Sequence, residues 1–135
     1  MHHRPEPTPK VLCIDDDPDV SRAIQLRLDN FEVEVIPAFF GTQGLGLAVT
    51  EKPDVIITDL KMPQGGGEYL LECLKCNAKT VDIPVIVLTG KSDENLPARM
   101  YRLGAAKLLK KPIAFDELVQ ELRRYIELRE RTAQP

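Results

Sequence analysis

The centre of the sequence reads Asp54-Val-Ile-Ile-Thr-Asp59-Leu-Lys-Met-Pro-Gln-Gly-Gly-Gly67. Its three consecutive β-branched residues, 55–57, predict a short strand that is buried on both faces, as in parallel sheets. Asp59 stands at the carboxyl end of that strand, and Pro63 and the glycines after it predict a turn before the next helix. Because open α/β sheets bind ligands at this end of their strands, the stretch predicts a functional site around Asp59.

The composition narrows the class of protein. The chain has 135 residues, enough for one domain with a single core. Its net charge of -3, with basic and acidic residues interspersed, predicts no direct binding of nucleic acid. No apolar run approaches the roughly 18 residues of a membrane span, and the first ten residues lack the apolar segment of a signal peptide. Three cysteines suit a reducing compartment, so we expect a cytoplasmic protein without a membrane partner.

Hydrophobic patterns elsewhere predict four further strands and five helices. The strands are expected at 11–14, 31–35, 85–88 and 106–109, and the helices at 18–30, 41–51, 68–76, 96–104 and from 116 onward. Gly44 and Gly46 oppose the second helix, by about 1 kcal/mol each relative to alanine. The last helix is expected to be long, with Arg123 and Glu127 paired on its exposed side.

The alternation of strands and helices predicts an α/β fold with a doubly wound, five-stranded parallel sheet. Three strands are wholly apolar and therefore central, whereas 31–35 alternates apolar and charged residues like an edge strand. The strand order 2-1-3-4-5 of flavodoxin-like folds follows, with the switch point between the first and third strands. The crevice there should hold Asp15, Asp16 and Asp59, with Thr89 and Lys111 on the same rim.

This group of side chains indicates phosphoryl chemistry. Converging carboxylates repel one another unless a cation lies between them, and Mg²⁺ is the best complement for their oxygen atoms. Beside such an ion Asp59 can attack a phosphoryl group as a nucleophile. The Lys111 ammonium and the Thr89 hydroxyl can then hold the oxygens of the acyl phosphate.

Five short motifs together resemble the receiver domain of two-component response regulators, of the chemotaxis-regulator type, from Lys10 to about Arg129. The motifs are Asp15-Asp16-Asp17-Pro18, Thr58-Asp59-Leu60-Lys61-Met62-Pro63 with Gly67, Leu88-Thr89-Gly90, Gly104-Ala105 and Lys111-Pro112. The resemblance implies a signalling phosphoacceptor domain rather than an enzyme. The bond before the matching proline is often cis in this family.

The resemblance also implies roles for individual residues. Asp59 would accept phosphate from a histidine kinase or phosphotransfer protein. Asp16, Asp59 and the backbone carbonyl of Lys61 would bind Mg²⁺ directly, and Asp15 through water. Thr89 and Lys111 would bind the phosphoryl group and thereby shift an output surface. This surface would be formed by the fourth helix, the fifth strand and the fifth helix, and it would contact an effector.

The chain departs from the family pattern at three positions. Leu108 stands where an aromatic residue is common, Gly90 replaces the usual alanine, and Pro97 shortens the fourth helix. The expected division is a disordered tail at 1–9, a receiver domain at 10–130, and a tail or linker at 131–135. The cognate kinase, the effector, the lifetime of the phosphate and the formation of a homodimer stay open.

Two other functions compete with the phosphorylated switch. A binding module of the same fold could dispense with phosphate, although the complete set of five site residues speaks against it. A Mg²⁺-dependent phosphatase with an aspartyl-phosphate would need a second aspartate two residues past its nucleophile, where Lys61 stands. A calcium loop at 15–26 is excluded because Val20 and Leu26 occupy positions that need glycine and glutamate.

Overall fold

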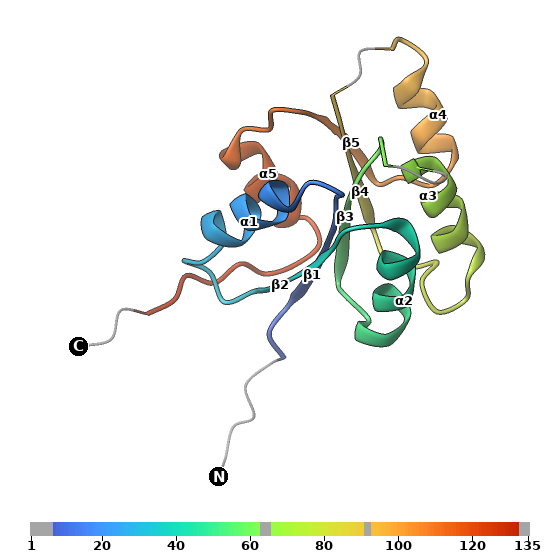
Figure 1. Cartoon of the computed structure of the whole chain (residues 1–135). Helices are drawn as coiled ribbons and strands as arrows, with labels where there is room; N and C mark the ends of the chain where they lie inside the picture. The colour runs from blue at the N-terminus through green and yellow to red at the C-terminus, as the bar shows by residue number, and fades with distance from the viewer. Residues whose placement is uncertain (1–6, 63–65, 91–92, 133–135) are drawn as a thin grey trace.

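The computed structural model describes residues 7–62, 66–90 and 93–132 (Figure 1). Within them, five parallel strands form one sheet in the order β2-β1-β3-β4-β5. The strands are β1 (Lys10–Ile14), β2 (Glu34–Ala38), β3 (Val55–Asp59), β4 (Val85–Thr89) and β5 (Lys107–Lys110). The predicted fold and strand order are confirmed. The turn predicted at Pro63 lies outside the described residues.

In the described part of the chain, five helices cover the two faces of the sheet. They are α1 (Pro18–Arg27), α2 (Gly41–Glu51), α3 (Gly66–Cys76), α4 (Leu96–Arg102) and α5 (Phe115–Leu122). Helices α1 and α5 lie on one face, and α2, α3 and α4 lie on the other (Figure 1). Within the described residues, no helix has the length and apolar character that crossing a membrane requires.

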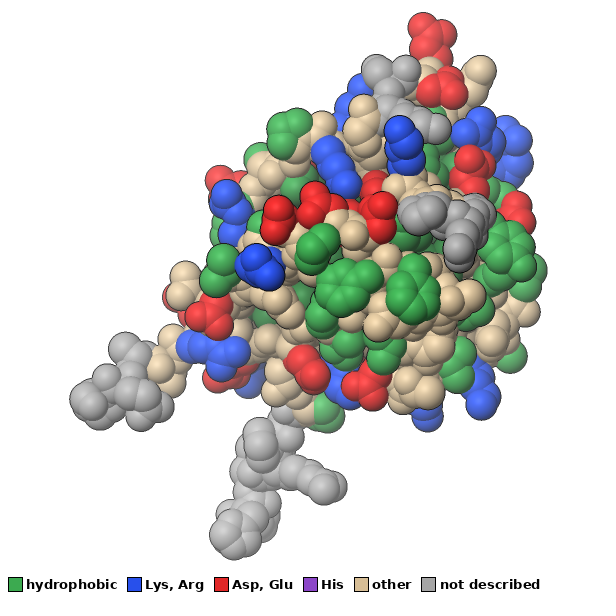
Figure 2. All heavy atoms as spheres, in the orientation of Figure 1, with side chains coloured by type: hydrophobic (Ala, Val, Ile, Leu, Met, Phe, Trp, Pro, Cys, Tyr) green, Lys and Arg blue, Asp and Glu red, His purple; other side chains and the backbone are tan. Residues whose placement is uncertain are grey.

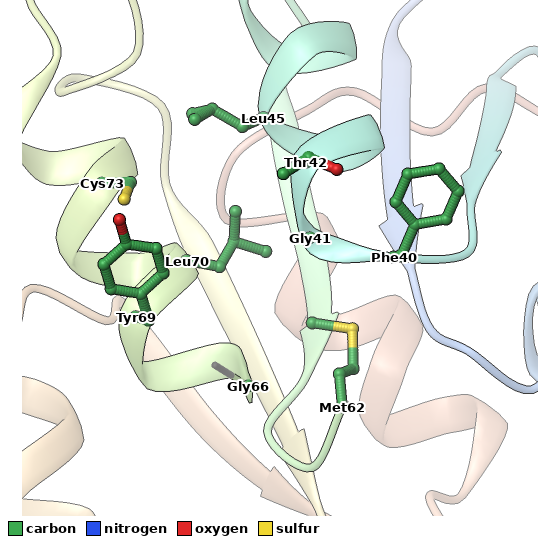
Figure 3. A pocket seen from close by; sticks show the side chains of 9 residues that line it. All are labelled: Phe40, Gly41, Thr42, Leu45, Met62, Gly66, Tyr69, Leu70 and Cys73. Carbon is green, nitrogen blue, oxygen red and sulfur yellow. The ribbon is translucent and has the colours of Figure 1, made fainter. Parts of the chain in front are cut away.

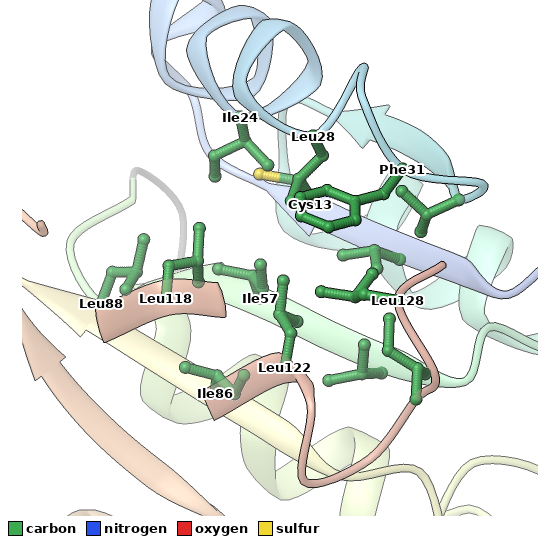
Figure 4. Close-up of a cluster of buried hydrophobic side chains, with 14 of the residues drawn as sticks. Cys13, Ile24, Leu28, Phe31, Ile57, Ile86, Leu88, Leu118, Leu122 and Leu128 are labelled. Carbon is green, nitrogen blue, oxygen red and sulfur yellow. The ribbon is translucent and has the colours of Figure 1, made fainter. Parts of the chain in front are cut away.

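Each face of the sheet has its own hydrophobic core. Val11 and Cys13 of β1 pack under α1 and α5, in the cluster shown in Figure 4. Leu12 and Ile14 alternate with them and pack under α2, α3 and α4. Because successive side chains of a strand point to opposite faces, a strand covered on both sides must be apolar throughout. This requirement explains the wholly apolar runs of β1, β3 and β4.

The second strand begins later than predicted, at Glu34 instead of Phe31. The alternation of residues 31–35 is real, because Phe31 and Val33 are buried, whereas Glu32 and Glu34, which follow each of them, are exposed. However, Phe31 forms an isolated antiparallel bridge with Glu130. The N–H of Glu32 donates to the carbonyl of Arg129 over 2.7 Å. The C-terminal segment around Arg129 and Glu130 therefore pairs with the first residues of the predicted edge strand.

Helix α5 ends at Leu122, so the long helix predicted there is wrong, and with it the pair of Arg123 and Glu127. Glu127 lies beyond the helix and forms an ion pair with Arg129 at 3.1 Å. The Arg123 guanidinium lies over the Phe31 ring, 5.6 Å from its centroid. The chain turns back onto the core after α5 and buries Ile126 and Leu128. The free energy gained by this burial exceeds what further turns of the helix would contribute.

The two glycines of α2 have different surroundings. A Cβ atom at Gly44 would lie 2.5 Å from Cδ1 of Ile14, whereas at Gly46 it would meet nothing within 4 Å. Gly44 therefore lets the helix approach β1 closely. The packing that this approach allows offsets the low helix propensity of glycine.

Candidate functional site

The predicted site residues come from four neighbouring strand ends. Asp15 follows β1, Asp59 ends β3, Thr89 ends β4, and Lys111 follows β5. Because these strands are parallel, their carboxyl ends lie along one edge of the sheet. The N–H of Lys111 donates to the carbonyl of Thr89 over 2.8 Å. The peptide bond between Lys111 and Pro112 is cis, as the resemblance implied.

Three carboxylates gather at this edge. Ligand oxygens of Asp15, Asp16 and Asp59 all lie within 4.8 Å of one another. Asp15 is 1% exposed and Asp59 7% exposed, whereas Asp16 is open to solvent. Oxygen ligands at this spacing, with one open side, fit a hard divalent cation such as Mg²⁺.

Lys111 supplies the positive charge of the site. Its Nζ atom lies 3.0 Å from Oδ2 of Asp15 and 3.3 Å from Oδ1 of Asp59. Burial lowers the pKa of Lys111, but its hydrogen bond to Asp15 and the charges of both carboxylates outweigh this, so that pKa is raised. The side chain thus stays protonated beside the carboxylates.

Asp15 is held by two hydrogen bonds. Its Oδ1 atom accepts from the N–H of Asp17 at 2.9 Å, and its Oδ2 atom accepts from Lys111. Burial raises the pKa of Asp15, and these hydrogen bonds oppose the rise. Asp17 in turn caps α1, because its Oδ1 atom accepts from the N–H of Asp19. Hydrogen bonds within residues 15–19 therefore hold the acidic loop in place around Asp15.

The start of α3 packs directly on the backbone of Asp59. The N–H of Gly67 donates to the carbonyl of Leu60 over 2.8 Å. A Cβ atom at Gly67 would lie 2.4 Å from the carbonyl oxygen of Asp59. The sequence indicated only that a glycine here would help a turn. The close approach of two backbones, which only glycine permits, becomes visible in the structure.

An open cleft of about 540 Å³ adjoins the carboxylates. The described residues that line it are Asp16, Asp59, Lys61, Met62, Gly90 and Lys111. Thr89 lies on the same edge but is only 2% exposed and does not line the cleft. The structure thus brings the carboxylates of Asp15, Asp16 and Asp59 close together and places Lys111 against two of them, whereas Thr89 is almost fully buried.

Apolar hollows lie on both sides of this cleft. One, between α1 and α5, is lined mostly by apolar residues such as Ile24 and Pro112, together with Lys111 and two other charged side chains. The other, between α2 and α3, shares Met62 with the cleft and includes Phe40 and Tyr69 (Figure 3). Figure 2 shows acidic side chains along the upper edge of an apolar patch. Sequence patterns gave no sign of either hollow, because their walls come from separate helices.

Comparisons with known proteins agree with this geometry. A family model described as the response regulator receiver domain matches residues 11–123. Over 113 residues the chain is 33% identical to Protein PilH of Pseudomonas aeruginosa, and the match covers 84% of this chain and 93% of PilH. Among solved structures, chemotaxis protein CheY4 of Vibrio cholerae superimposes with a TM-score of 0.82 at 26% identity. That match covers 89% of this chain and 100% of CheY4.

Several relatives are much longer than this chain. It is 32% identical over 126 residues to the DNA-binding dual master transcriptional regulator RpaA of a Synechocystis strain, and covers 52% of that protein. It is 34% identical over 111 residues to hybrid signal transduction histidine kinase D of Dictyostelium discoideum, and covers 7% of it. The match covers 93% of this chain for RpaA and 82% for the kinase. The shared part is therefore one module of these larger proteins.

Proposed function

The chain belongs to the family of response regulator receiver domains, and from this membership we propose that Asp59 is its phosphoacceptor. The observation that carries the proposal is the position of the Lys111 ammonium, within 3.3 Å of carboxylate oxygens of both Asp15 and Asp59. A nucleophilic carboxylate needs such a cation beside it, because the phosphoryl group brings further negative charge. The donor in this proposal is a histidine kinase or a phosphotransfer protein.

In the proposed reaction an Asp59 carboxylate oxygen attacks the phosphorus of a phosphohistidine in line with the leaving imidazole. The new bond joins this oxygen to phosphorus, the phosphorus–nitrogen bond breaks, and its electron pair returns to the imidazole. Lys111 then binds an oxygen of the acyl phosphate. The Thr89 hydroxyl is proposed to donate a hydrogen bond to another oxygen of the acyl phosphate, which requires the end of β4 to open toward the cleft.

Asp16, Asp59 and the Lys61 carbonyl are the proposed direct ligands of Mg²⁺, with Asp15 acting through water. Both carboxylate oxygens of Asp15 already accept hydrogen bonds, which supports the indirect role. The bound ion supplies positive charge that offsets the charge of the phosphoryl oxygens.

The proposal also names the partner surfaces. The apolar hollow at Ile24 and Pro112 adjoins Lys111. A donor protein that reaches Asp59 can therefore cover this hollow with apolar side chains of its own. The output surface is formed by α4, β5 and α5, where an effector binds.

Residues 10–130 are the proposed functional module, and we propose no nucleic-acid partner for it. We place it in the cytoplasm, since its three cysteines are free thiols that a reducing compartment would preserve.

Mass spectrometry after exposure to a small-molecule phosphodonor tests the proposal. We expect one phosphoryl adduct on the wild type that requires Mg²⁺ and disappears in Asp59→Asn. Asp82→Asn, which changes an exposed aspartate far from the site in sequence, is the matched control and should keep the adduct. Absence of an adduct from the wild type would instead favour the binding module that works without phosphate.

A further inference from the structure

Helix α4 has seven residues, and its first turn contains Pro97. Two of its side chains, Leu96 and Met100, are buried in the core. Two others form polar contacts with neighbouring elements. The Tyr101 hydroxyl accepts from the N–H of Leu108 on β5 over 3.3 Å, and Arg99 binds Glu68 on α3. Helix α4 is therefore connected both to the strand that leads to Lys111 and to the helix that follows Asp59.

The contact between Arg99 and Glu68 is bidentate. Nε of Arg99 donates to Oε1 of Glu68 at 2.9 Å, and Nη2 donates to Oε2 at 3.2 Å. Both side chains are somewhat more than 40% exposed, so the pair adds little to overall stability. Two parallel hydrogen bonds between planar groups do, however, define a distance and an orientation. The pair is suited to position α4 rather than to stabilise the fold.

The position of Glu68 depends on the backbone at the end of β3, the strand that carries Asp59. Glu68 follows Gly67, whose N–H binds the carbonyl of Leu60 and whose Cα lies too close to Asp59 to tolerate a side chain. The N–H of Leu60 donates to the carbonyl of Leu88 on β4. A shift of the backbone at Asp59 therefore moves the first turn of α3, and Glu68 with it.

We infer that Glu68 and Arg99 are positioning residues that transmit the state of Asp59 to α4. This inference rests on the proposed function, because it assumes that Asp59 is phosphorylated and that α4 belongs to the output surface. The transmission runs through contiguous contacts, from Asp59 and Leu60 to Gly67, and from Glu68 to Arg99. Loss of either charged group should uncouple α4 while leaving the phosphorylation chemistry intact.

Amide hydrogen exchange of peptides that cover α4, before and after phosphorylation of the full chain, measures this coupling. We expect phosphorylation to change the exchange of α4 in the wild type. In Glu68→Gln and in Arg99→Gln the change should shrink by about threefold or more, with unaltered phosphoryl uptake. The double variant Glu68→Arg with Arg99→Glu should recover most of the response, because it rebuilds the pair with reversed charges.

Two exposed residues provide matched controls, Glu72→Gln one turn along α3 and Arg102→Gln one turn along α4. Both should respond like the wild type. A full response of α4 in Glu68→Gln and Arg99→Gln would overturn the inference. It would also be overturned if the double variant with reversed charges responded no better than these two. A wild type that takes up phosphate without any change in α4 would overturn it while the proposed function stands. A wild type that takes up no phosphate would overturn both.

Discussion

The ammonium group of Lys111 lies 3.0 Å from Oδ2 of Asp15, although 96 positions separate the two residues in the sequence. The Asp15 side chain is 2% exposed and that of Lys111 29%. A carboxylate this deeply buried depends on its partner, because solvent can hardly replace the lost hydrogen bond. The contact also joins the loops that follow the first and last strands of the chain.

Lys111→Met should lower the free energy of unfolding of the metal-free protein by about 1–3 kcal/mol, because the buried carboxylates of Asp15 and Asp59 lose their cation. Mg²⁺ should then stabilise this variant more than it stabilises the wild type, since it replaces the missing charge. Urea unfolding with Mg²⁺ and with a chelator measures both effects, and Lys79→Met at an exposed position is the control. An equal gain from Mg²⁺ in variant and wild type would contradict the role given to Lys111.

Cys13 should make stability depend on pH in the alkaline range. Burial, followed by the charge of Asp15, raises the pKa of its thiol to about 12. In the unfolded chain the thiol ionises near pH 8.5, so above that pH the unfolded state binds fewer protons than the folded state. The stabilising contribution is therefore complete below about pH 8.5 and is lost as the pH rises toward 12.

Urea unfolding of the wild type and of Cys13→Ala at several pH values between about 8 and 11 isolates this contribution. Other groups, such as Tyr125, whose pKa is also raised to about 12, titrate in both proteins. The wild type should lose more stability than the variant over this range. Parallel curves would show that the Cys13 thiol does not carry the effect.

The two glycines of α2 should respond in opposite directions to the same substitution. Gly46→Ala should stabilise the protein by about 0.5–1 kcal/mol, because the new methyl group meets open space and alanine favours the helix. Gly44→Ala should destabilise it by about 1–3 kcal/mol, since the methyl group would collide with the buried Ile14 side chain. Guanidinium unfolding of both variants provides the measurement. A gain in stability for Gly44→Ala would show that α2 can shift away from β1 at little cost.

Gly67→Ala should impair phosphoryl uptake more than it impairs folding. Its methyl group would lie 2.4 Å from the carbonyl oxygen of Asp59, and relief of this clash must move backbone at the phosphoacceptor. Gly90→Ala is the matched control, because Gly90 lines the same cleft and a Cβ atom there meets nothing within 4 Å. The rate of adduct formation and circular dichroism should be measured together. Normal uptake in Gly67→Ala would show that the close approach is dispensable.

The order of the strands, and the set of polar side chains that meet at their carboxyl ends, could be predicted from the sequence. Wholly apolar runs identify strands covered on both faces, and a polar residue at the end of such a run must emerge at the common edge. Asp15, Asp59 and Lys111 could be placed together on this basis. Even the helix at Gly41–Glu51 was predicted correctly, although the reason for Gly44 was not visible.

Which segments pair across long distances in the chain could be seen only in the folded protein. The alternation at Phe31 and Val33 is the same whether their partner is β1 or the returning segment at Glu130, so the pattern could not distinguish them. The end of α5 depends likewise on the burial of Leu128 against the core. The contact of Arg99 with Glu68 depends on how α3 and α4 are placed. Local patterns record which face of an element is buried, whereas partners far apart in the chain are selected by packing.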